Sequence, residues 1–248
     1  MTDRLGYRCK IGVLAPAFNA ALQPELEAMK PHGVTHHLAR IEVEDGPLTT
    51  DQQQTDLVTR VGPGVPAALR RLLPVGPAIV LHGISIPTFW DGPSGARRIL
   101  AELESMAGVP AVVGALACEH ALERLGRPRR LAIITPYQPI GDAAVRSYFE
   151  SLGYEVVALF SLLRPGHQAI AHAQTDEIVA AFKTVAASQP DAILQVGTNL
   201  AAADLAAEAE RWIGLPAIAI NAAIYWAGLR RCGINDSIRG FGRLLEDH

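Results

Sequence analysis

Two apolar segments of this chain end in glycine, and they occupy matching positions in a duplicated pattern. They are residues 78–83 (AIVLHG) and residues 192–197 (AILQVG). Each is preceded by an apolar run that ends in proline, at Pro16 and Pro136, and is followed by a segment containing Pro110 or Pro216. The offset between the copies is 120 residues for the first pair of prolines and 106 for the second. Landmarks in the same order predict two related halves with one cleft between them.

Short β-branched runs alternate with helical patterns, which is typical of parallel, doubly wound sheets. The expected strands are 11–15, 78–82, 110–113, 131–135, 155–159, 192–196 and 216–220. The expected helices are 66–73, 94–106, 119–125, 142–152, 175–188 and 201–213. The chain of 248 residues is 49% apolar and 19% charged, which suits a well-buried core. We therefore predict an α/β fold of two pseudo-duplicated lobes, 1–118 plus 224–248 and 119–223, with an active-site cleft between their parallel sheets.

Charge and composition exclude several classes of partner. The net charge of −3 gives no electrostatic basis for binding nucleic acid or an anionic membrane. No apolar run approaches the roughly 20 residues that span a bilayer, and the first residues lack the apolar stretch of a secretion signal. The sequence therefore predicts a cytoplasmic protein with neither a nucleic-acid nor a membrane partner.

The cysteines and histidines do not form a ligand pattern. Cys9, Cys118 and Cys232 are scattered and have no CxxC spacing, which indicates reduced thiols with neither a disulfide framework nor a zinc site. The eight histidines include the neighbours His36 and His37, but no HExxH pattern appears. We expect neither a metal nor another cofactor.

The residues that follow each predicted strand are the functional candidates, because ligands of parallel α/β sheets bind beyond the carboxyl ends of the strands. In this chain they are residues 16–19, 83–90, 136–137 and 197–199. Several carry side chains that donate hydrogen bonds.

A set of short motifs in these places resembles a known superfamily. The motifs are APAFN at 15–19, GIS at 83–85, TPY at 135–137, GTN at 197–199, NAAIYW at 221–226 and GFGRLL at 240–245. In order and spacing they resemble the aspartate/glutamate racemase superfamily, especially its maleate cis-trans isomerase and arylmalonate decarboxylase branch. The resemblance implies two pseudo-symmetric lobes, an active site between them that uses no cofactor, and a homo-oligomer.

The chain departs from that superfamily at the two strand turns. Its racemases and maleate isomerases use two cysteines, one at each turn, and its decarboxylases keep the second as the proton donor to an enediolate. Here both positions are glycine, Gly83 and Gly197, and none of the three cysteines lies near either position in the sequence. The departure argues against cysteine-based racemisation and against the usual maleate isomerisation.

Hydrogen-bond donors still surround the two glycines. Small residues and backbone N–H groups at strand ends can cradle a carboxylate or a developing enediolate. The predicted substrate-binding residues are Asn19, Gly83, Ser85, Tyr137, Gly197, Thr198, Asn199 and Asn221. For the asparagines at 19 and 221, a contact with the substrate carboxylate is what the resemblance implies. The alternative for the polar residues is ordinary turn chemistry.

Two histidines are candidates for the proton transfer that the cradle cannot perform. His167 is the first, because the family counterpart of its segment borders the decarboxylase pocket; the alternative is an exposed loop histidine. His82 is the second, because it directly precedes Gly83. Strand alternation, however, points His82 away from its neighbour's side, where it would be a packing residue. Asp91 could act as a base or cap the following helix.

These residues predict a cofactor-independent isomerase- or decarboxylase-like enzyme that acts on a small mono- or dicarboxylate through a stabilised enediolate. A one-sided reaction, such as decarboxylation, hydration or elimination, fits better than a two-sided one, because no pair of thiols flanks the substrate. Two alternatives stay open. One is a non-catalytic binder of small carboxylates, and the other is a hydrolase or hydro-lyase that depends on histidine and aspartate.

Overall fold

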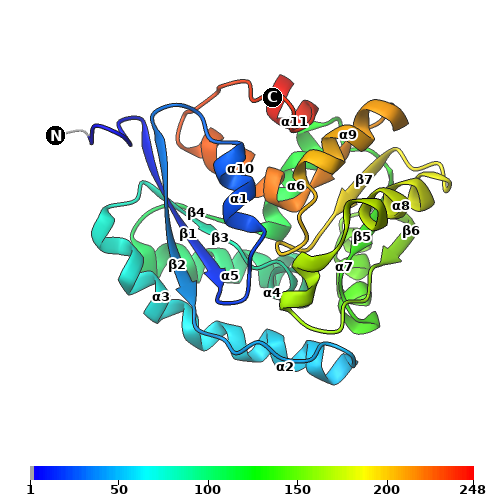
Figure 1. Ribbon diagram of the computed structural model, residues 1–248, viewed down its shortest axis with the longest axis horizontal. Coiled ribbons are helices and arrows are strands. Elements are labelled where there is room, and N and C mark those ends of the chain that lie inside the picture. The colour runs from blue at the N-terminus through cyan, green and yellow to red at the C-terminus, as the bar shows by residue number, and fades with distance from the viewer. Residues whose placement is uncertain (1–2) are drawn as a thin grey trace.

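The computed structural model describes residues 3–248 and contains two four-stranded sheets, each entirely parallel (Figure 1). The first has the order β2-β1-β3-β4, with β1 Cys9–Pro16, β2 Val34–Ile41, β3 Ile79–His82 and β4 Ala111–Val113. The second has the order β6-β5-β7-β8, with β5 Arg130–Thr135, β6 Glu155–Ser161, β7 Ala192–Gln195 and β8 Ala217–Ala219. The same order of strands recurs in both sheets, so the predicted α/β fold with two duplicated halves is confirmed.

Strand β2 was not predicted from the sequence. Strand β2 lies at the edge of the first sheet, pairs only with β1, and is mostly half-buried. Its sequence, VTHHLARI, places His36 and His37 in the middle of the strand. An edge strand needs apolar side chains over only part of its length, so these polar residues hid the pattern.

Eleven α-helices connect the described strands. They are α1 Leu22–Ala28, α2 Asp51–Val61, α3 Val65–Leu72, α4 Ile86–Trp90, α5 Gly92–Ala107, α6 Gly114–Arg124, α7 Pro139–Ser151, α8 Thr175–Ala186, α9 Ala203–Ile213, α10 Ile220–Arg231 and α11 Arg243–Asp247. Three short 3₁₀ helices add Gly62–Gly64, Leu73–Val75 and Gln168–His172. The six predicted helices correspond to α3 and to α5 to α9. Helix α5 begins at Gly92, two residues before the predicted start, with Pro93 in its first turn.

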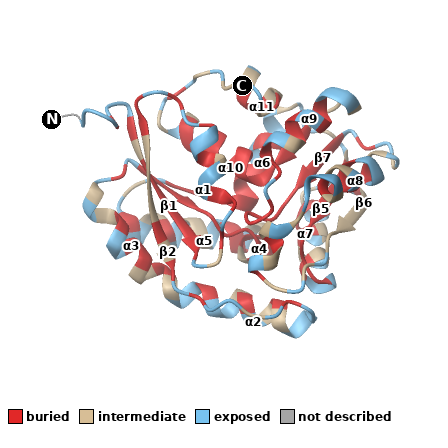
Figure 2. Cartoon of the chain, in the orientation of Figure 1, coloured by how far each residue is buried: buried red, intermediate tan, exposed pale blue. Residues whose placement is uncertain are grey.

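The two halves are joined by helices that belong to both. The predicted boundaries of the lobes fall inside α6 and α10, and these two helices pack against each other. Helix α10 also packs on β3 and β4, and Figure 2 shows it almost wholly buried in the middle of the molecule. Helices α2 and α4 of the first half pack on α7 of the second. Within residues 3–248, no helix combines the length and apolar character needed to cross a membrane.

Candidate active site

The carboxyl ends of β1, β3, β5 and β7 meet around one small cavity of about 40 Å³ between the two halves. Seven of the ten predicted site residues line it: Asn19, Ser85, Tyr137, His167, Gly197, Thr198 and Asn199. Apolar side chains complete the wall, among them Phe18, Leu57, Val61, Ile86 and Ile170. Leu57, Val61 and Ile170 were not predicted, because an apolar residue on a helix gives no signal that separates a pocket wall from the core.

Three polar residues from three strand turns form one hydrogen-bonded group. The hydroxyl oxygen of Ser85 lies 2.6 Å from the phenolic oxygen of Tyr137. The backbone N–H of Thr198 donates to Ser85 Oγ at 3.2 Å, and Thr198 Oγ1 donates to the carbonyl of Gly83 at 3.0 Å. Burial raises the pKa of Tyr137, so its hydroxyl keeps its proton at neutral pH. Since Thr198 already donates to Ser85 and Gly83, the group can present one neutral hydroxyl donor, from Ser85 or Tyr137, to an anion.

The two asparagines of the cavity are mainly bonded to the backbone. Asn19 Oδ1 accepts from the N–H groups of Ala21 and Leu22 at the start of α1, at 3.2 and 3.0 Å. Asn199 Oδ1 accepts from Ala20 N at 2.7 Å, and Asn199 Nδ2 donates to the carbonyl of His167 at 2.9 Å. Both side chains thus hold the two halves together across the cleft, and Asn19 Nδ2 reaches Thr198 Oγ1 at 3.4 Å.

His167 is buried, with 0% of its surface exposed, and does not lie on an open loop. Its ring stacks on Phe18, with 4.9 Å between the ring centroids. Within residues 3–248 neither ring nitrogen has a hydrogen-bond partner, and the nearest carboxylate oxygen, Asp45 Oδ1, lies 3.6 Å from Nδ1. Burial lowers the pKa of His167, while Asp45 opposes that shift. The ring is therefore an unsatisfied titratable group at the cavity wall.

Two loops close the cleft around His167. Pro47 and Gly166 form an isolated antiparallel bridge, and Leu48 N donates to the carbonyl of Pro165 at 2.9 Å. Gln168 N donates to Asp45 Oδ1 at 3.2 Å. The cavity of about 40 Å³ is small beside the roughly 300–1,000 Å³ of ordinary ligand sites. These contacts leave His167 buried where the two halves meet.

Three predicted site residues lie outside the cavity wall. Gly83 lies behind it and contributes the carbonyl that accepts from Thr198. Asn221 donates to the carbonyl of Thr198 at 3.0 Å and to Glu25 Oε2 at 2.5 Å, so it supports the Thr198 turn from behind. Burial raises the pKa of Glu25 to about 7, although hydrogen bonds from Ala203, Asn221 and Ala202 oppose the shift. His82 lines a different and larger cavity, as the strand alternation indicated.

The two glycines at the strand turns leave no room for a side chain. A Cβ on Gly83 would lie 2.1 Å from Leu22 Cδ2 and 2.7 Å from the carbonyl oxygen of Leu14. Gly197 has a φ of +124°, and a Cβ there would lie 2.7 Å from the ring of Pro136. L-residues rarely adopt this backbone conformation. The local backbone at both turns is thus built for glycine.

Charged and metal-binding groups are scarce at the site. No lysine or arginine is among the side chains that line the cavity. Across residues 3–248, no three histidine, cysteine, aspartate or glutamate side chains come together in a way that could hold a metal ion. Asp91, the other candidate base, lies on the rim of the larger cavity and pairs with Arg98 at 2.5 Å.

Two facing parallel sheets that share one cleft at their carboxyl ends define a two-lobed α/β protein of the aspartate/glutamate racemase type. The sequences of the family described as arylmalonate decarboxylase match this chain over residues 16–245. The chain belongs to the arylmalonate decarboxylase family. An arylmalonate decarboxylase from Bordetella bronchiseptica is 29% identical to it over 184 residues, which cover 72% of this chain and 75% of the relative.

Solved structures share the fold at lower sequence identity. The maleate cis-trans isomerase of Nocardia farcinica bound to TRIS has a TM-score of 0.86 at 19% identity, over 96% of this chain and 98% of that chain. The maleate isomerase Iso of Pseudomonas putida S16 also has a TM-score of 0.86 at 19% identity, over the same shares. A crystal structure of arylmalonate decarboxylase has a TM-score of 0.75 at 21% identity, over 96% of this chain and all of that chain. The resemblance inferred from the motifs is confirmed.

Proposed function

We propose that this protein is a cofactor-independent decarboxylase of a small dicarboxylate that works without a cysteine thiol. The observation that carries the proposal is the convergence of Ser85, Tyr137 and Thr198 on one side of a small cavity and of His167 on its wall. The membership of the chain in the arylmalonate decarboxylase family supports the same reaction class. Cleavage of a substituted malonate is the reaction that these residues fit best.

The polar group would stabilise the charge that develops during decarboxylation. One carboxylate of the substrate leaves as CO₂, and the electron pair of the broken C–C bond moves into the remaining carboxylate to form an enediolate. Ser85 and Tyr137 would supply a hydroxyl donor in a buried place, where such a donor stabilises an oxyanion far better than it does in water, and Thr198 N–H would hold Ser85 in position. Removal of one donor of this kind costs about 100-fold or more in rate.

His167 would deliver the proton to the carbon of the enediolate. The lowered pKa leaves its ring neutral in the free protein. A bound dianion beside the ring would raise the pKa of His167, so the imidazole takes up a proton as the substrate binds. The enediolate that remains after CO₂ leaves then lies next to the imidazolium of His167. The proton is therefore delivered to one face of the enediolate only. Asp45, 3.6 Å from Nδ1, would orient the ring.

One-sided delivery is also what separates this proposal from isomerisation or racemisation, for which groups are needed on two faces. The strand turns that would carry thiols are Gly83 and Gly197, and both lack space for a Cβ. Asn19, Asn199 and Asn221 hold the backbone of the cleft in this proposal and do not take part in the reaction.

The test is proton NMR in deuterated buffer with phenylmalonate and maleate as the two substrates. We expect phenylmalonate to give CO₂ and phenylacetate that carries one deuterium, and maleate to stay unchanged. His167→Gln should abolish turnover while keeping the fold, whereas His172→Gln, an exposed neighbour, should keep full turnover. Saturable binding of either compound with no turnover would replace the proposal by a non-catalytic carboxylate binder. Conversion of maleate would replace it by isomerisation.

A further inference from the structure

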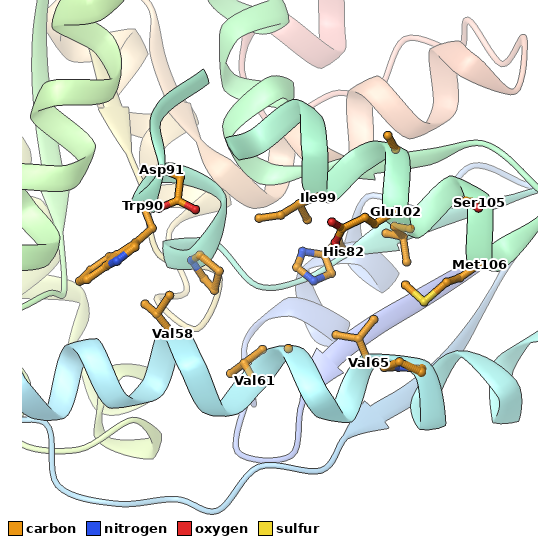
Figure 3. Close-up of a pocket in the computed structure, with 15 residues that line it drawn as sticks. Val58, Val61, Val65, His82, Trp90, Asp91, Ile99, Glu102, Ser105 and Met106 are labelled. Atoms are coloured by element: carbon orange, nitrogen blue, oxygen red, sulfur yellow. The ribbon is translucent and has the colours of Figure 1, made fainter. Parts of the chain in front are cut away.

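A second cavity, far larger than the cleft, lies between the helices of the first half. Its volume is about 800 Å³, which is within the range of about 300–1,000 Å³ of small-molecule sites. The wall is mostly apolar and consists of Val58, Val61 and Val65 on one side and of Trp90, Ile99 and Met106 on the other. Figure 3 shows these side chains facing each other across the space between α2–α3 and α4–α5.

A single buried polar side chain projects into this apolar space. His82, the last residue of β3, is 4% exposed and lines the cavity between Val61 and Ile99 (Figure 3). Its Nδ1 atom is enclosed and has no hydrogen-bond partner within residues 3–248, so Nε2 is the ring nitrogen that a molecule in the cavity can reach. A polar atom in apolar surroundings favours a ligand that pairs with it, because burying it without a partner costs free energy.

The charges around the cavity select the class of ligand. Burial lowers the pKa of His82 to about 4, so the ring is neutral at physiological pH. The charged residues that line the cavity are Asp91 and Glu102, and no lysine or arginine is among them. Asp91 is paired with Arg98, and Glu102 repels an anionic ligand. A hydroxyl group both donates and accepts, so it pairs with Nε2 whichever tautomer the neutral ring adopts.

We propose that this cavity binds an uncharged, mainly apolar molecule that carries one hydroxyl group, placed on His82. The site is separate from the cleft, because Val61 is the one residue that lines both cavities. It therefore takes a different ligand class from the carboxylates of the proposed reaction, and it stands whether or not that reaction is right.

Four probes of similar size, each built on a phenyl ring with a two-carbon chain, distinguish an alcohol, a hydrocarbon, a cation and an anion as the preferred ligand. They are 2-phenylethanol, ethylbenzene, phenethylamine and phenylacetate, each titrated by calorimetry. We expect 2-phenylethanol to bind once per chain and roughly tenfold more tightly than ethylbenzene, the value of about one satisfied hydrogen bond. Tighter binding of the amine, tighter binding of phenylacetate that Met106→Trp weakens and that is therefore in this cavity, or binding of none of the four, would overturn the proposal.

Two variants locate the binding in this cavity. Met106→Trp narrows the cavity from the exposed side of α5 and should lower the affinity for 2-phenylethanol at least tenfold. Ile140→Trp places the same side chain at a partly exposed position on α7, outside the cavity, and should leave the affinity unchanged.

A third variant tests the hydrogen bond: His82→Leu should remove the preference for the alcohol over ethylbenzene. If His82→Leu does not fold, the proposal is still tested by the affinity of Met106→Trp and by the ratio of the affinities for 2-phenylethanol and ethylbenzene in the natural chain. Unchanged affinity in Met106→Trp would refute the site.

An independent observation concerns two cysteines that the sequence places far apart. Cys9 begins β1 and Cys232 directly follows α10, yet their Sγ atoms lie 3.1 Å apart. Both are free thiols, Cys9 buried and Cys232 half-exposed. A disulfide has an S–S distance of about 2.05 Å, so the two sulfur atoms have to approach by about 1 Å for the bond to form.

We infer that Cys9 and Cys232 form a reversible disulfide under oxidation by a peroxide. The Cys232 thiolate attacks hydrogen peroxide, which breaks the O–O bond, releases water after protonation and leaves a sulfenic acid. The Cys9 sulfur then attacks the sulfenic sulfur, the S–S bond forms, and the second water leaves. Cys232 is the attacking thiol because it is the more exposed one and because Cys9 and Arg231 lower its pKa.

Intact-mass spectrometry with thiol counting tests this inference after treatment with hydrogen peroxide. We expect two thiols and two hydrogen atoms to be lost, full reversal by dithiothreitol, and a cross-linked peptide that joins Cys9 to Cys232. Cys118 is buried and alone, so Cys118→Ser should behave like the natural chain. Cys9→Ser should abolish the loss of hydrogen. Addition of oxygen to Cys232 in the natural chain, without a cross-link, would contradict the inference.

Discussion

Ser85 Oγ lies 2.6 Å from the phenolic oxygen of Tyr137, and this contact joins the turn after β3 to the turn after β5. The same oxygen accepts from Thr198 N, at the turn after β7. One hydroxyl thus ties together three strand ends from both halves of the molecule. Because each of these groups is buried, the position of any one of them depends on the other two.

Loss of either partner in this contact should affect stability and ligand binding together. Tyr137→Phe and Ser85→Ala should each lower the free energy of unfolding by about 1 kcal/mol, the typical value of a buried hydrogen bond. The double variant should lose less than the sum of the two, with a coupling of about 0.5 kcal/mol or more. Urea unfolding of the four proteins measures this coupling. Additive losses would show that the two hydroxyls do not interact.

A side chain at either glycine turn should disturb the fold without creating a working thiol site. Gly83→Cys drives Cβ into the carbonyl of Leu14, and Gly197→Cys forces a strained φ, so each should cost about 1–3 kcal/mol. Gly62→Ala is the matched control, because nothing lies within 4 Å of its Cβ and the residue is helical. Thermal unfolding compares them. A stable Gly197→Cys protein that racemises or isomerises a carboxylate would contradict this expectation.

His82 should make the protein sensitive to acid. Its pKa falls from 6.5 to about 4 on folding, so between these values the unfolded chain binds the proton and the folded chain does not. Stability should therefore fall as the pH decreases from about 6.5 to about 4, by about 3 kcal/mol in total. Chemical unfolding across this range should have a shallower pH dependence in His82→Leu than in the natural chain. His172→Leu, at an exposed position, should keep the natural slope.

Binding of a dicarboxylate should be accompanied by proton uptake at His167. Calorimetry in two buffers of different ionisation enthalpy should detect up to about one proton per site, and the affinity should rise as the pH falls toward the pKa of the free ring. Asp45 raises the pKa of His167, so Asp45→Asn should lower that pKa further. The same rise in affinity should then occur at lower pH. Proton uptake that persists in His167→Gln would assign the proton to another group.

Local pattern was enough to predict the duplicated halves, because buried strands are short apolar runs and helices end at glycine or proline. The same pattern brought the polar residues of the candidate site together, since residues that follow buried parallel strands lie at one edge of a sheet. Asn19, Ser85, Tyr137 and Thr198 were found in this way. Strand β2 was missed because a half-buried edge strand tolerates the polar residues that broke its pattern.

Only the tertiary structure showed what surrounds each of the two histidines and which residues distant in the chain are paired. Strand alternation turned His82 into the larger cavity, whereas the loop with His167 closes on Phe18 and Asp45 from the other half. The same packing brought Cys9 within 3.1 Å of Cys232 and left no space for a Cβ at Gly83. Sequence determines which side chains follow each strand, because that depends on neighbours in the chain. Distances between the halves depend on how α6 and α10 pack, which no local pattern records.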